Sequence, residues 1–146
     1  MIKFAFAVAA AGMALAPISA TMAIAAPQQA DIIQQLFDKA AEIYKDKGYT
    51  ETGWQQRGEM KQGAETSYTI TLKGGTQYSI VGMCDTDCSN LDAYLTDSSG
   101  KLVDSDVEED DFPIVAASAS GTYTLRLVMK ACSSAPCAFG AKSFKQ

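Results

Sequence analysis

The side chains best suited to chemistry lie between Asp85 and Asp111, a stretch with ten carboxylates and a single lysine. Calcium takes about six to eight oxygen ligands from carboxylates, amides and backbone carbonyls, so these loops predict a calcium site. The alternative is that Asp and Asn bond their own backbone in turns and keep the surface soluble. Neither loop is an EF-hand, since counting from Asp85 and from Asp104 puts Asn90 and Glu109 where that motif needs glycine. The candidate calcium ligands are Asp85, Asp87, Asn90 and Asp92 on the first loop and Asp104, Asp106, Asp110 and Asp111 on the second.

The four cysteines form two close pairs, Cys84 with Cys88 and Cys132 with Cys137. Each pair follows a predicted strand, where a turn can bring two Cα atoms within disulfide range, so we expect a disulfide within each pair. Bridges between the two pairs are the alternative and would close larger loops. Export to an oxidising compartment argues against a four-cysteine zinc site, and neither pair has the Cys-x-x-Cys spacing of redox motifs.

Histidine is absent from the whole chain. A Ser-His-Asp triad, a Cys-His nucleophile and a His-ligated zinc site are therefore excluded. Ser98 and Lys101 have the Ser-x-x-Lys spacing, but they fall in a turn, whereas the enzymatic motif opens a helix. We expect no catalytic residues and no enzymatic activity. A small hydrolase that uses paired carboxylates is the alternative.

The first 25 residues have the pattern of a secretory signal peptide. Lys3 supplies the positive charge, an apolar run follows from Phe4 to Leu15, and Ala23 and Ala25 suit cleavage after Ala25. We expect a periplasmic or secreted protein with no membrane insertion after cleavage. The net charge of −5 and the scattered Lys and Arg residues argue against nucleic-acid partners.

Residues 26–49 are expected to carry one amphipathic helix over 31–47, because apolar side chains recur there at helical spacing. Asp31 can cap its start, with Gln34 three residues on, and Gly48 follows its end. The apolar face of this helix packs either on the domain that follows or on another protein.

Residues 50–146 change to a period of two, which predicts β-strands. The alternation is clearest in 122–130, where Tyr123, Leu125, Leu127 and Met129 share one face. Similar patterns occupy 67–72, 77–83 and 90–95, and weaker ones occupy 53–63, 101–105, 112–117 and 138–144. The sequence therefore predicts an all-β protein, a jelly-roll-like antiparallel β-sandwich of seven or eight strands preceded by one amphipathic helix.

The order of short motifs from about residue 64 to 145 resembles the bacterial pre-peptidase C-terminal domain family. The matching segments are Tyr78-Ser79-Ile80, the run from Asn90 to Gly100, Val103-Asp104-Ser105-Asp106, and the run from Gly121 to Leu127. Asn90 stands where the family pattern has aspartate, and the four cysteines are an addition to it. The resemblance implies a β-sandwich with a non-catalytic accessory, adhesion or folding role.

The expected function is that of an exported, non-catalytic binding or accessory module, with calcium as a candidate stabilising ion. Its partner would be an envelope or extracellular protein or a polysaccharide. An inhibitor or folding partner of a secreted protease is an alternative that rests on the resemblance alone. Trp54 and Tyr94 are the aromatic residues most expected on a binding surface, because Tyr94 falls outside the predicted inward register and Trp54 lies in a polar strand.

Overall fold

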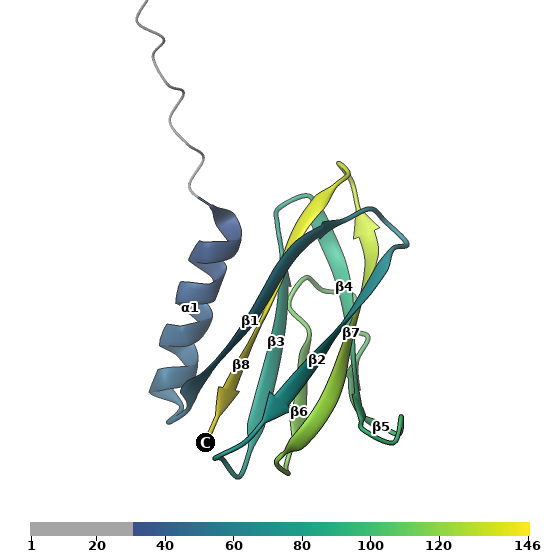
Figure 1. Cartoon of the computed structure of the whole chain (residues 1–146). Helices are drawn as coiled ribbons and strands as arrows, with labels where there is room; N and C mark the ends of the chain where they lie inside the picture. Colours follow the sequence, from purple (N-terminus) through teal and green to yellow (C-terminus); the bar gives the residue numbers. More distant parts are fainter. Residues whose placement is uncertain (1–30) are drawn as a thin grey trace, which may run out of the picture.

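The computed structural model describes residues 31–146, which form one helix followed by eight strands in two antiparallel four-stranded sheets (Figure 1). The predicted all-β sandwich with a preceding helix is confirmed. The predicted signal peptide lies outside the described residues. The elements are α1 (Ile32–Asp46), β1 (Thr50–Met60), β2 (Glu65–Leu72), β3 (Tyr78–Cys84), β4 (Cys88–Asp97), β5 (Leu102–Asp106), β6 (Ile114–Ala117), β7 (Gly121–Cys132) and β8 (Cys137–Lys145).

The two sheets pack face to face around the main hydrophobic core. Sheet A has the strand order β1-β8-β3-β6, and sheet B has the order β2-β7-β4-β5. The alternating residues predicted to point inward do so, and Leu91, Leu95, Leu125 and Leu127 are at most 1% exposed. In β2 and β7 the side chains that share the inner face are more buried than their neighbours, as the two-residue period predicts.

Helix α1 lies against the outer face of sheet A (Figure 1). Its start is capped by Asp31, whose side chain accepts the Gln34 N–H at 3.3 Å, as the sequence predicted. Its buried residues Phe37 and Tyr44 join a second core with Val81, Met83 and Phe144, and the Tyr44 ring stacks on Phe144 with centroids 4.3 Å apart. The apolar face of the helix is therefore used within the chain.

Strand β3 is buried on both faces, whereas a period of two predicts one buried face. Tyr78 and Ile80 face the sandwich core, whereas Val81 and Met83 face the helix. A strand covered on both sides loses the apolar-polar alternation and becomes a continuous apolar run. The run Ile80–Met83 in the sequence is the trace of that double burial.

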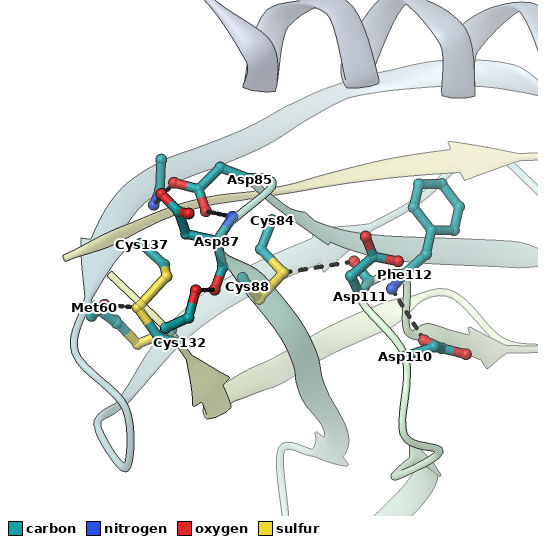
Figure 2. The surroundings of a disulfide bond; sticks show 12 residues. Met60, Cys84, Asp85, Asp87, Cys88, Asp110, Asp111, Phe112, Cys132 and Cys137 are labelled. Atoms are coloured by element: carbon teal, nitrogen blue, oxygen red, sulfur yellow. Dashed lines mark hydrogen bonds between the residues drawn. A yellow bond between two sulfur atoms is a disulfide. The ribbon is translucent and has the colours of Figure 1, made fainter. Parts of the chain in front are cut away.

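Both disulfides lie at one end of the sandwich and join the residues of each close pair (Figure 2). The Cα atoms of Cys84 and Cys88 are 5.8 Å apart, and those of Cys132 and Cys137 are 6.0 Å apart. Because Cys88 lies directly opposite Cys132 in the β4–β7 pairing, the two bridges close neighbouring strand ends. The expected pairing within each close pair is confirmed.

Gly140 in β8 allows the helix to approach sheet A. A Cβ atom at this position would lie 2.7 Å from Ile33 Cγ2 and 2.7 Å from Phe37 Cζ, closer than side chains pack. We expect Gly140→Ala to lower the free energy of unfolding by about 1–3 kcal/mol, because the helix must shift outward. Urea unfolding followed by circular dichroism measures the change.

Gly121→Ala in β7 is the matched control. A Cβ atom there meets only the Tyr123 ring at 3.5 Å, an ordinary contact distance. Its effect should stay within about 0.5 kcal/mol. Equal losses in the two variants would contradict a role for Gly140 in helix docking.

Candidate functional site

Two carboxylates of β5 hold the edge of sheet A against the edge of sheet B. Asp104 Oδ2 accepts the N–H of Ala116 at 2.8 Å, and Asp106 Oδ2 accepts the N–H of Ile114 at 2.8 Å. β6 is the last strand of sheet A and β5 is the last strand of sheet B. These side chains thus satisfy backbone donors that the edge strand β6 would otherwise present to another chain.

Asp85 of the first loop also bonds the backbone through its carboxylate. Asp85 Oδ2 accepts the Ala138 N–H at 2.7 Å, and its other oxygen accepts the Asp87 N–H at 3.2 Å. On the second loop, Asp110 accepts the N–H of Phe112 at 3.0 Å. Figure 2 shows Asp85 and Asp87 separated from Asp110 and Asp111 rather than converging on one point.

The two remaining candidate ligands lie in β4. Asp92 is only 4% exposed and accepts a hydrogen bond from the Tyr94 hydroxyl at 3.2 Å. The Oδ1 atom of Asn90 is buried without a hydrogen-bond partner among the described residues. Within residues 31–146, no three Cys, Asp or Glu side chains are placed together so as to hold a metal ion. The eight predicted ligands therefore do not form one coordination site in this arrangement.

Exposed apolar side chains concentrate along the β5–β6 edge. Among the described residues, five large hydrophobic side chains are exposed, and four of them lie between residues 102 and 114 with exposures of 41% to 54%. Residues 102–117 also contain six carboxylates and no Lys or Arg. The four exposed apolar residues are Leu102, Val103, Val107 and Ile114. We call this strip, from Leu102 to Ala117, the β5–β6 edge surface.

A cleft of about 490 Å³ lies between this surface and the C-terminal end of α1. Val103, Asp104 and Ala116 line one side, and Tyr44 and Lys47 line the other. The Tyr44 hydroxyl is bonded to the Ser79 hydroxyl at 2.7 Å, and burial raises the pKa of Tyr44 above its usual value. The Lys47 ammonium lies 5.3 Å from the centre of the Tyr44 ring. The cleft is large enough to receive a side chain of a partner.

The two aromatic residues predicted for a binding surface lie elsewhere. Trp54 of β1 packs partly buried against the main core and meets the Tyr68 ring at 6.4 Å between centroids. Tyr94 lies in β4 with the Arg126 guanidinium 4.0 Å from its ring centre. Desolvation, and after it the charge of Asp92, raises the pKa of the Tyr94 hydroxyl. The structure does not bring these two residues into one site.

Sequence reasoning did not single out the apolar residues of the β5–β6 edge surface. Leu102, Val103 and Val107 flank the segment Asp104-Ser105-Asp106, and nothing in this pattern distinguishes exposed apolar residues from buried ones. The one indication that these residues are exposed was the neighbouring acidic run, because a segment so short and so charged does not form a core strand. Only the strand order shows that they lie at an edge.

Comparison with models of known protein families found no match to this chain, and comparison with curated proteins found none either. The resemblance to pre-peptidase C-terminal domains therefore stays an expectation based on the motifs. In the part of the chain that the structure describes, no helix is both long and apolar enough to cross a membrane.

Removing the carboxylates of both Asp104 and Asp106 should weaken the contact between β5 and β6. We expect Asp104→Ala with Asp106→Ala to lower the free energy of unfolding by about 2 kcal/mol, since each lost hydrogen bond is worth about 1 kcal/mol. Urea unfolding measures it. The charge-matched control is Glu108→Ala with Glu109→Ala, two exposed carboxylates, and should change stability by less than about 0.5 kcal/mol. Equal losses of stability in the two double variants would show that the removed charge, and not the hydrogen bonds to β6, causes the change.

The spread of the carboxylates predicts that calcium does not stabilise the protein. A ligand that binds only the folded state raises stability by about 2.7 kcal/mol at a hundred times its dissociation constant. We expect the melting temperature to be the same in millimolar calcium and in a chelator, measured by differential scanning calorimetry. A rise of several degrees in calcium would instead support the metal site expected from the sequence.

Proposed function

We propose that this protein is an exported, non-catalytic module that binds another protein through the β5–β6 edge surface. The observation that carries the proposal is the concentration of exposed apolar side chains between Leu102 and Ile114. Exposed apolar side chains bordered by charged residues are typical of protein-interaction sites. The signal-like first 25 residues and the two disulfides support export to an oxidising compartment.

The charge of the surface defines the partner. Asp104, Asp106 and the run 108–111 surround the apolar residues with negative charge, and no Lys or Arg interrupts residues 102–117. Complementary potentials favour a partner whose apolar contact residues are bordered by Lys and Arg. The cleft beside Val103 would receive one of its larger side chains, in the way that interface pockets hold anchor residues.

The non-catalytic character rests on how the polar groups are used. The chain has no histidine, and Asp85, Asp104 and Asp106 already accept backbone N–H groups. A hydrolase needs one carboxyl group with a raised pKa in a substrate-sized cleft. The carboxylates of Asp85, Asp104 and Asp106 instead accept hydrogen bonds from backbone N–H groups within the chain.

The experiment has two stages. The protein, purified after export, first captures partners from the envelope fraction, and each captured protein is then purified and titrated by calorimetry. We expect Leu102→Ser with Val107→Ser to weaken binding at least tenfold, since two truncated interface contacts cost more than about 1.4 kcal/mol. Binding should also weaken as salt rises from 50 mM to 500 mM, roughly the range over which charges become screened.

Ile43→Ser is the matched control, because Ile43, on α1, is the one other large exposed hydrophobic side chain among residues 31–146. This variant should bind like the unchanged protein. Equal weakening by Ile43→Ser, or full binding by the Leu102 and Val107 double variant, would contradict the proposed surface. Capture of a protein-free envelope polysaccharide in place of a protein would contradict the proposed partner class.

A further inference from the structure

The sandwich has four edge strands, and three of them are protected against pairing with another chain. β1 has a register shift between Glu51 and Gln55, with Gly53 at φ +89°. β6 has its outward N–H groups bonded by Asp104 and Asp106. β5 is five residues long, carries those two aspartates and has its own register shift against β4. Bulges, charges and short length are the usual means of blocking an edge.

β2 has none of these protections. It is an eight-residue strand, Glu65–Leu72, with no Pro, no Gly and no register shift against β7. In the described part of the chain it pairs only with β7, and every second residue from Glu65 to Thr71 is exposed. A long, regular edge whose one charged residue, Glu65, lies at its start is a template for strand addition.

The backbone groups that face the free edge of β2 follow from its pairing with β7. Met129 donates its N–H to the carbonyl of Ala64 at 2.9 Å, so the Ala64 carbonyl faces β7. In an antiparallel strand these directions alternate, so Thr66, Tyr68 and Ile70 also bond β7. The N–H and C=O groups of Ser67, Thr69 and Thr71 therefore point away from β7, toward the free edge.

We propose that the free edge of β2 binds the β2 strand of a second copy of this chain. An antiparallel pair with its two-fold axis at Thr69 places Ser67 opposite the partner copy's residue 71 and Glu65 opposite the partner copy's residue 73, a lysine. Each opposite-charge pair occurs twice, as a two-fold contact requires. Tyr68 then lies opposite the partner copy's residue 70, an isoleucine, on the inner face.

The pairing of Glu65 with Lys73 favours this strand register over the adjacent registers. Shifting the axis to Tyr68 or to Ile70 puts Thr71 or Ser67 opposite the charged residue and leaves Glu65 and Lys73 without each other. Glu65 already bonds Arg126 at 3.0 Å, and both side chains are partly exposed, so the carboxylate can bridge Arg126 and the incoming lysine. The result is one continuous eight-stranded sheet built from two copies of sheet B.

Sedimentation velocity of the protein purified after export, at concentrations up to about 1 mM, tests the dimer. We expect Thr69→Pro to abolish it, because proline removes two central donors while the β2–β7 ladder stays intact. Lys73→Glu should raise the dimer dissociation constant about tenfold by placing glutamates opposite each other, and Glu65→Lys with Lys73→Glu should restore it. The double variant also loses the solvent-exposed ion pair between Glu65 and Arg126, which contributes little to stability.

Amide hydrogen exchange distinguishes this edge from any other contact. The amides of Ser67, Thr69 and Thr71 should become protected as concentration rises, whereas those of Thr66, Tyr68 and Ile70 are protected throughout by β7. A protein that stays monomeric at every concentration would overturn the proposal. So would a dimer that survives both Thr69→Pro and Lys73→Glu, since a different surface would then hold it. Because Lys73 lies after β2, its variant folds even if the proline variant does not.

Discussion

The packing of α1 on sheet A is the interaction on which the rest of the structure depends. Phe37 reaches the sheet only because Gly140 leaves room for its ring, and Tyr44 completes the contact by stacking on Phe144. This packing buries the second face of β3 and leaves sheet B as the layer with one face open to solvent. The C-terminal end of the helix also forms one wall of the cleft beside the β5–β6 edge surface.

The carboxylates of β5 have two physical effects at once. By accepting the N–H groups of Ile114 and Ala116 they deny the edge of β6 to an incoming strand. Their charge also gives an acidic border to the exposed apolar residues on the same edge. A partner at this surface would therefore be recognised through side chains, whereas the free edge of β2 offers backbone groups. The two proposed interactions use opposite edges of the sandwich and different chemistry.

Much of the fold was predictable because burial in a sandwich imposes a local signature. Alternating residues such as Leu125 and Leu127 identify a strand and its inner face, and the helical spacing around Phe37 identifies α1. The disulfides were predictable for a similar reason, since cysteines four or five residues apart at a strand end can meet across a turn. The candidate site was not predictable in this way. Two of the acidic residues predicted as calcium ligands, Asp104 and Asp85, bond the backbone of Ala116 and Ala138, and no local pattern indicates these partners.

The sequence by itself determined the periodicities, and with them the helix, the strands and the inner faces, because each depends on neighbours a few residues apart. Tertiary structure alone decided which strands became edges and which outer face the helix covered. It also decided that Leu102 and Val107 stay exposed while Val81 and Met83 are buried. The physical reason is that exposure depends on what packs across from a strand, and that partner comes from a distant part of the chain.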